Sequence, residues 1–178
     1  VMPSDAHIPS PAGAVESRPV ERLLDAVTRV QSTFLLHNDA RAAFEASLAA
    51  LLELTGSRFG FLAEAAHDLD GTPFLRTHAI SDIAWNAATR AHYERYHAQG
   101  LEFRRLDTLF GHVLVHREVV ISNDPASDPR KGGLPPGHEL LRAFLDIPLL
   151  SGERLIGMIG LANRPGGYEE AMVRTVQP

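Results

Sequence analysis

Apolar residues recur at helical spacing near the N-terminus. Pro19 suits the first turn of a helix, and apolar side chains then follow at alternating intervals of three and four, namely Val20, Leu23, Val27, Val30 and Phe34. This is the a/d spacing of a helix that packs against a partner helix. Because it covers only about two heptads, an ordinary amphipathic helix packed on its own domain explains it as well.

A second helix is predicted directly afterwards. Asn38 and Asp39 are good helix caps, and Gly56 is well placed to end the helix. The apolar face between them consists of Phe44, Leu48, Leu51 and Leu52.

Two pairs of β-like segments predict hairpins. Residues 58–65 and 74–81 flank the turn signal Asp70-Gly71, whereas 143–150 and 154–163 flank a turn at Ser151-Gly152-Glu153. Because hairpins dominate, we expect an α+β fold whose sheet is mostly antiparallel and carries helices on both faces.

Further elements lie between and after the hairpins. Asp82 is a candidate cap for a helix over 83–99, and Asp107 for a shorter helix over 108–116. Residues 118–122 form a short β-like run, and a last helix is predicted from Tyr168 onward.

A long irregular segment, residues 123–138, precedes the second hairpin. It contains the prolines Pro125, Pro129, Pro135 and Pro136 together with three glycines. Loops of this length inside a compact domain are uncommon and often functional.

Composition narrows the possible functions. The chain has 178 residues, 44% of them hydrophobic and 22% charged, with a net charge of −5, so we expect one domain and no nucleic-acid partner. No apolar stretch approaches the length of a membrane span, and residues 1–18 resemble a flexible leader rather than a signal peptide. We therefore expect a cytoplasmic protein without a membrane partner. The absence of cysteine excludes disulfides, thiolate metal sites and thiol nucleophiles.

Three segments of the second half carry a family resemblance. They are Asn123–His138 with its Asn-Asp-Pro and Asp-Pro-Arg steps, Phe144–Leu149 and Gly157–Tyr168. Together with the order of elements, they resemble a GAF domain of the bacterial subgroup found in sensor histidine kinases and diguanylate cyclases. The resemblance implies an antiparallel sheet of five or six strands, with helices that often form a dimer bundle on one face. Small ligands would bind on the other face, under the connections 82–117 and 123–140.

This resemblance leads to a functional hypothesis. We expect a leader over 1–18, a GAF-like sensory domain over 19–170 and the start of a C-terminal signalling helix over 171–178. The domain would sense an unknown small molecule, form a homodimer through its terminal helices and relay the ligand state to a downstream output domain of a longer chain. The alternative is a ligand-free dimerisation or coupling module, and a small enzyme is a third hypothesis.

The ligand-binding residues predicted from the sequence are Trp85, Phe110, Asn123, Asp124, Arg130 and Leu134. Arg130 is chosen because a guanidinium recognises carboxylate or phosphate in a directional, bidentate way. The structural alternative is that Arg130 pairs with a nearby aspartate and holds the loop together. Trp85 and Phe110 are equally compatible with core positions.

No catalytic residue, metal site or cofactor is predicted. Bilin-binding GAF domains and GAF-type methionine sulfoxide reductases depend on cysteine, which is absent here. For cyclic-nucleotide binding, Asn163-Arg164 and Tyr168 match part of the family signature, but Met172-Val173 stand where its acidic pair belongs. His112 and His116 share a helix face without the third ligand and the acid or base that a zinc hydrolase requires.

Overall fold

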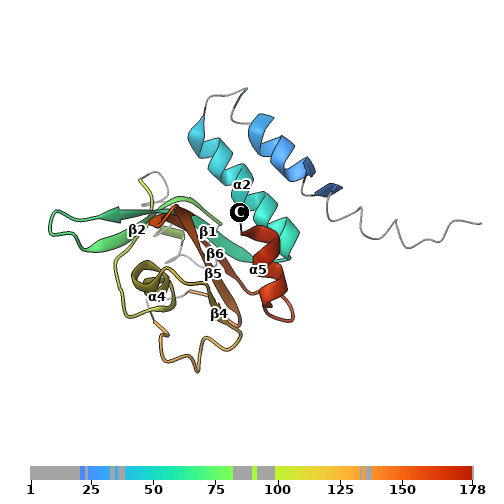
Figure 1. Cartoon of the computed structure of the whole chain (residues 1–178). Coiled ribbons are helices and arrows are strands. Elements are labelled where there is room, and N and C mark those ends of the chain that lie inside the picture. The colour runs from blue at the N-terminus through green and yellow to red at the C-terminus, as the bar shows by residue number, and fades with distance from the viewer. Residues whose placement is uncertain are drawn as a thin grey trace, which may run out of the picture.

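The computed structural model describes residues 21–22, 24–32, 35, 39–81, 90–91, 99–132, 134 and 138–177. Within them, 21–22 and 24–32 are helical, and the later elements are α2 (Ala40–Thr55), β1 (Phe59–His67), β2 (Pro73–Ile80), β3 (Glu102–Phe103), α4 (Leu109–His116), β4 (Val120–Ser122), β5 (Phe144–Ser151), β6 (Arg154–Ala162) and α5 (Glu170–Val176) (Figure 1). The predicted leader and Trp85 fall outside the described residues, and of the predicted helix over 83–99 only residues 90–91, which are helical, and residue 99 are described. No described helix has the length and hydropathy needed to cross a membrane.

The strands form one six-stranded sheet in the order β3-β2-β1-β6-β5-β4. Every neighbouring pair in this sheet is antiparallel. The two predicted hairpins, β1–β2 and β5–β6, are joined through the pairing of β1 with β6. The predicted α+β class with an antiparallel sheet is therefore confirmed. The short edge strand β3 was not predicted, because two residues carry no periodic pattern.

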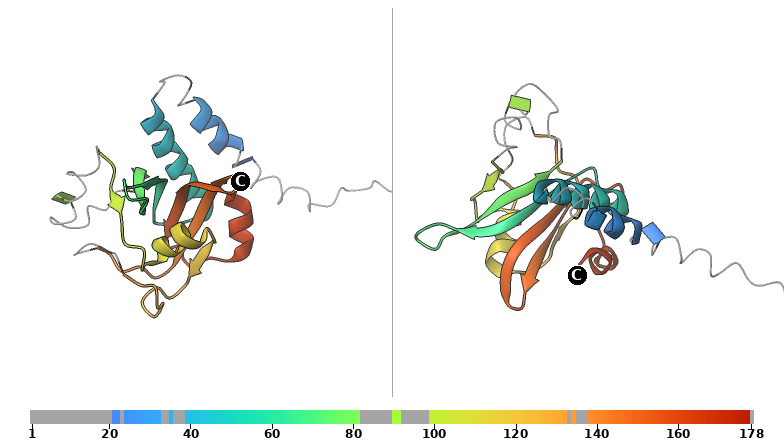
Figure 2. Two further views of the ribbon diagram at one scale, coloured as in Figure 1. Left: turned by 60° about the vertical axis from the view of Figure 1, so that its left-hand side comes forward. Right: turned by 90° about the horizontal axis from the view of Figure 1, so that it is seen from above.

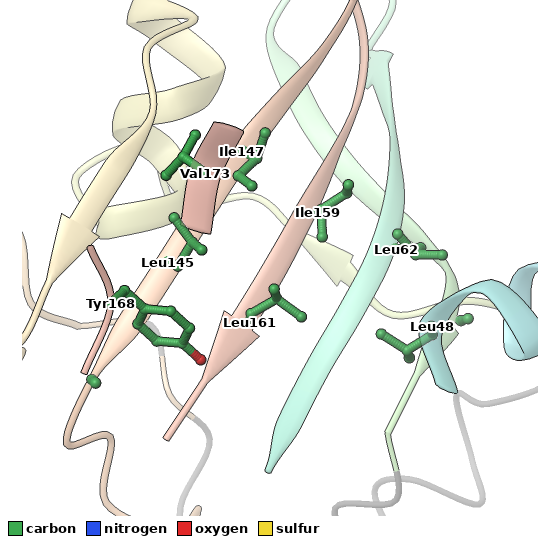
Figure 3. Packing of buried hydrophobic residues seen from close by; sticks show 10 residues of the cluster. Leu48, Leu62, Leu145, Ile147, Ile159, Leu161, Tyr168 and Val173 are labelled. Carbon is green, nitrogen blue, oxygen red and sulfur yellow. The ribbon is translucent and has the colours of Figure 1, made fainter. Parts of the chain in front are cut away.

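Helices cover both faces of the sheet (Figure 2). On one face, α2 and α5 pack over a core of buried apolar side chains that includes Leu48 of α2 and Val173 of α5 (Figure 3). On the other face, α4 supplies Leu109, Val113 and Leu114 to a second core. The central strands are therefore buried on both sides, and successive residues of β6 alternate between the two cores.

The ends of α2 follow from the sequence. The Asp39 carboxylate accepts hydrogen bonds from the backbone N–H groups of Arg41 and Ala42, and Gly56 adopts a left-handed conformation with φ of 66° at the C-terminal end. Glycine takes this conformation without the steric cost that a Cβ atom brings. Both predicted signals at these two residues are confirmed.

The predicted starts of the last two helices need correction. Thr108, not Asp107, caps α4, since its hydroxyl accepts a hydrogen bond from Gly111 N–H, while the Asp107 carboxylate pairs with Arg105. The last helix begins at Glu170 rather than at Tyr168. The Tyr168 side chain is buried instead, and its hydroxyl lies 2.8 Å from the Ser57 hydroxyl.

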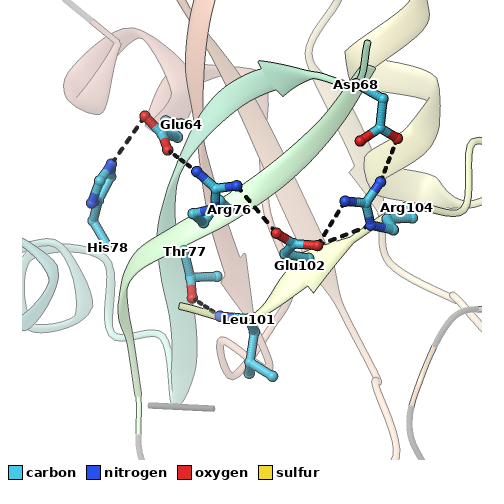
Figure 4. A network of polar contacts seen from close by, with 8 residues as sticks. All are labelled: Glu64, Asp68, Arg76, Thr77, His78, Leu101, Glu102 and Arg104. Atoms are coloured by element: carbon cyan, nitrogen blue, oxygen red, sulfur yellow. Dashed lines mark hydrogen bonds and ion pairs between the residues drawn. The ribbon is translucent and has the colours of Figure 1, made fainter. Parts of the chain in front are cut away.

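Charged side chains tie β3 to the rest of the sheet. Arg76 of β2 contacts Glu64 of β1 and Glu102 of β3, and Glu102 also contacts Arg104 (Figure 4). These side chains are exposed, so each ion pair contributes at most about 1 kcal/mol. Their main effect is to position the segment that follows β3, which borders the cavity described next.

Candidate functional site

A cavity of about 780 Å³ lies on the α4 side of the sheet. Its floor consists of β1, β6 and the start of β5, and its sides are formed by residues from 99–105, the start of α4 and the described residues Gly132, Leu134, His138 and Leu141. Most of its described lining is apolar, including Phe59, Phe61, Ile80, Leu101, Phe103, Leu109, Phe110, Leu134, Leu141, Phe144 and Ala162. Cavities of this size with a few polar groups are typical of small-molecule sites.

Three phenylalanine rings, those of Phe61, Phe103 and Phe110, form a row along one part of this cavity. The ring centroids of Phe61 and Phe103 lie 5.2 Å apart in an edge-to-face arrangement, and those of Phe103 and Phe110 lie 5.2 Å apart with the rings tilted. Aromatic rings at such separations attract each other beyond simple burial. The row gives this part of the cavity an aromatic lining.

Polar groups on the lining are few and already engaged. Arg105 pairs with Asp107, and Glu102 pairs with Arg76 and Arg104. The imidazole Nδ1 of His138 lies 2.6 Å from the Glu139 carbonyl oxygen. Burial lowers the pKa of His138, which favours the neutral ring.

A buried carboxyl group lies immediately behind the cavity floor. Asp146 of β5 is 0% exposed, and among the described residues neither of its carboxyl oxygens has a hydrogen-bond partner. Burial raises the pKa of Asp146 well above its ordinary value, because a carboxylate without water or a partner is strongly disfavoured. Burial therefore favours the neutral, protonated form of this group.

The residues predicted from the sequence divide into three groups. Phe110 and Leu134 line the cavity, and Leu134 is 46% exposed at its mouth. Asn123, Asp124 and Arg130 are not part of the described lining. Trp85 lies outside the described residues. The cavity thus brings together two of the six predicted residues, and ligand binding by any of the six stays a prediction.

The contacts of Arg130 are those expected if it pairs with a nearby aspartate of the same loop. Its guanidinium donates from Nε to Oδ1 of Asp128 and from Nη2 to Oδ2, both at 2.9 Å. The Arg130 backbone N–H also donates to the same carboxylate. These bonds hold the pKa of Asp128 well below its usual range, and they connect residues 128 and 130 within the loop.

Asn123 joins this loop to the C-terminal segment. Its side-chain amide donates to the Tyr168 carbonyl at 3.0 Å and accepts from the Tyr168 backbone N–H at 2.8 Å. Gly167 beside it has φ of 80°, and a Cβ atom there would lie 2.5 Å from Asn123 Oδ1. The contact requires glycine at this position, and it connects the start of the loop to the start of α5.

The residues that partly match a cyclic-nucleotide signature lie away from the cavity. The Asn163 amide binds the backbone of Leu140 and Arg142. Arg164 donates to the carbonyl groups of Thr55 and Gly167. These side chains fix the turn between β6 and α5.

His112 and His116 stack on α4, with ring centroids 4.2 Å apart. Within the described part of the chain, no group of three or more His, Cys, Asp or Glu side chains is arranged to hold a metal ion.

Comparison with known proteins identifies the family. Residues 37–178 match the family model described as a GAF domain, and this chain belongs to that family. A stretch of 67 residues is 37% identical to the methyl sulfide methyltransferase-associated sensor of Methanosarcina acetivorans. The aligned stretch is 37% of this chain and 7% of that sensor, so the chain corresponds to a small part of that protein.

Solved structures show the same fold in proteins of different function. The GAF domain of an Acinetobacter phosphoenolpyruvate-protein phosphotransferase matches with a TM-score of 0.64 and 14% identity, over 89% of this chain and 85% of that chain. The free methionine-R-sulfoxide reductase of Neisseria meningitidis, solved with its substrate, matches with a TM-score of 0.58 and 17% identity, over 98% and 89%. These similarities establish the fold, and function must be argued from the site.

Sequence reasoning missed Asp146 and most of the cavity floor. The alternation of β5 places Phe144 and Asp146 on one face and Leu145 and Ile147 on the other, so a single charged residue within an apolar strand was a usable signal. No sequence signal linked the three phenylalanines of the aromatic row, because they come from three separate segments.

The buried acid predicts an unusual pH dependence of stability. In the unfolded chain Asp146 ionises above about pH 4, whereas in the folded protein it keeps its proton to higher pH. The unfolding free energy should therefore fall by up to about 1.4 kcal/mol per pH unit from this group as pH rises between the two pKa values. Denaturant unfolding of the native chain and of Asp146→Asn, measured from pH 4 to 7, isolates this contribution. A stability difference between the two that stays constant over this range contradicts the buried neutral acid.

Proposed function

We propose that this GAF domain is the small-molecule-sensing regulatory module of a bacterial signalling protein and relays the ligand state to a downstream output domain. The cavity on the α4 side of the sheet is the observation that carries the proposal. Its lining is apolar and aromatic, which favours a largely apolar ligand. As a sensor the domain would not turn over its ligand, and the described lining offers no cysteine and no metal-binding cluster for such chemistry.

A physical route for the relay starts at the loop beside the cavity. Gly132 and Leu134 contribute to the cavity wall. Asn123, at the start of the same loop, forms two hydrogen bonds with the backbone of Tyr168. Tyr168 lies two residues before the start of α5, and its hydroxyl contacts Ser57 just after α2. A ligand that moves the loop would thereby change the position of α5 relative to α2.

The N-terminal helical segment supports association of two copies. Leu24 is 60% and Val27 is 44% exposed, whereas Ala26 between them is 4% exposed and faces the domain. Arg29 pairs with Glu53 of α2 at 3.1 Å, which ties the segment to the body of the domain. The exposed apolar side chains favour a homodimer through the terminal helices. The same surface would serve the ligand-free coupling module that is the second candidate function.

Filling the cavity tests the sensor hypothesis. Leu141→Trp places a large ring at a half-buried lining position, whereas Leu69→Trp, at a fully exposed turn, is the control. We expect protein purified from bacterial cells to carry a small-molecule adduct in native mass spectra. Leu141→Trp should lose this adduct and Leu69→Trp should keep it. Native protein without an adduct, or an adduct retained by Leu141→Trp, contradicts ligand sensing and favours the coupling module.

A charge in the exposed apolar stripe tests the dimer. Val27→Asp should dissociate it, because a carboxylate buried in an apolar seam without a partner costs several kcal/mol. Thr28→Asp, one residue along and exposed, should leave the association unchanged. Light scattering at tens of micromolar distinguishes these states. A native chain that is monomeric there, or equal effects of both substitutions, argues against this interface.

A further inference from the structure

Three neighbouring strands bring a carboxyl group, a glycine and an aromatic ring into one row beside the cavity. In the sheet register, Asp146 of β5 is opposite Gly160 of β6, and Gly160 is opposite Phe61 of β1. Residues directly opposite each other project to the same face of a sheet. Gly160 and Phe61 both line the cavity, so the Asp146 carboxyl lies next to the cavity floor.

The missing side chain of Gly160 creates the space that this row uses. A Cβ atom on Gly160 would lie 2.2 Å from Phe61 Cε1 and 2.8 Å from Asp146 Oδ1. The Phe61 ring thus lies over the glycine and beside the carboxyl. Because the carboxyl is fully buried, a ligand reaches it only if a neighbouring side chain such as the Phe61 ring turns aside.

No contact among the described residues indicates that the Asp146 carboxyl stabilises the fold. Among the described residues neither oxygen is hydrogen-bonded, although a polar group buried without a partner destabilises the folded state. The neighbours across the sheet are Val120 and Gly160, and neither side chain has a polar atom. An apolar residue would pack here at lower cost, so the group is better explained by a partner that arrives with the ligand.

We propose that Asp146 is the specificity-determining group of the cavity and pairs with a flat, neutral heterocycle that presents an N–H donor beside a carbonyl acceptor. This inference rests on the proposed function, in which the cavity holds the ligand. A neutral carboxyl group offers one O–H donor and one C=O acceptor side by side. It therefore matches such a lactam edge with two parallel hydrogen bonds, while Phe61, Phe103 and Phe110 contact the ring system.

Two small compounds distinguish the hydrogen-bonded pairing with Asp146 from apolar burial of the ring system. 2-Quinolone carries the lactam edge on a flat two-ring system, and N-methyl-2-quinolone has the same rings without the N–H donor. We expect the native chain to bind 2-quinolone about tenfold more tightly in NMR titrations, since the methylated compound leaves the buried acid without one partner.

Two variants locate this preference at residue 146. Asp146→Asn keeps a donor and an acceptor side by side, so it should keep the preference for 2-quinolone. Asp146→Leu removes both, so the two compounds should bind it within about twofold of each other. Asp146→Leu should also be at least as resistant to denaturant as the native chain, because the lone buried acid is gone.

The outcomes separate this inference from the proposed function. Equal binding of both compounds to the native chain, or a preference that survives in Asp146→Leu, overturns the role of Asp146 and leaves the cavity as the ligand site. No binding of either compound to the native chain overturns the proposed pairing, whereas the proposed function is decided by the co-purified adduct. If Asp146→Leu does not fold, Asp146→Ala takes its place, because it also removes both the donor and the acceptor.

Discussion

Burial of the central strands on both faces is the constraint on which the rest of this structure depends. The buried run of β6 is continuous from Gly157 to Ala162, and that of β5 from Phe144 to Pro148. Side chains alternate between the α2–α5 core and the α4 side. A slip of the register by one residue would exchange the two sets. The same burial deprives Asp146 of water, so its neutral carboxyl is a consequence of where the sheet places it.

The α4 side of the sheet is incompletely filled, and this distinguishes it from the side covered by α2 and α5. Only α4 packs there as a described helix, and loops complete the cover around the cavity. Hydrogen bonds hold these loops at defined points, namely Asn123 to Tyr168 and Arg130 to Asp128. The polar side chains of residues 123–130 therefore shape the boundary of the site, while its interior is formed by apolar side chains from the sheet and α4.

The sequence was sufficient for the fold and for part of the site. Local signals with a direct physical cause, such as the Asp39 cap, Gly56 and the two hairpins, agree with the structure. Phe110 and Leu134 were placed near the cavity because family resemblance located the loop-covered face. Arg130 shows the limit of reasoning from residue type, since a guanidinium suited to an anionic ligand is equally suited to the carboxylate two residues away. Asp146, Gly160 and Phe61 meet only through strand register, which no local pattern encodes.

We propose that the cavity on the α4 side of the sheet receives a flat ligand against its row of phenylalanines. Intermolecular nuclear Overhauser effects between the ring protons of bound 2-quinolone and the protein measure this directly. The account predicts that these effects involve the aromatic protons of Phe61, Phe103 and Phe110, whose rings line the cavity. Effects confined to exposed apolar side chains such as Leu24 or Leu69, with none to the three phenylalanines, would contradict it.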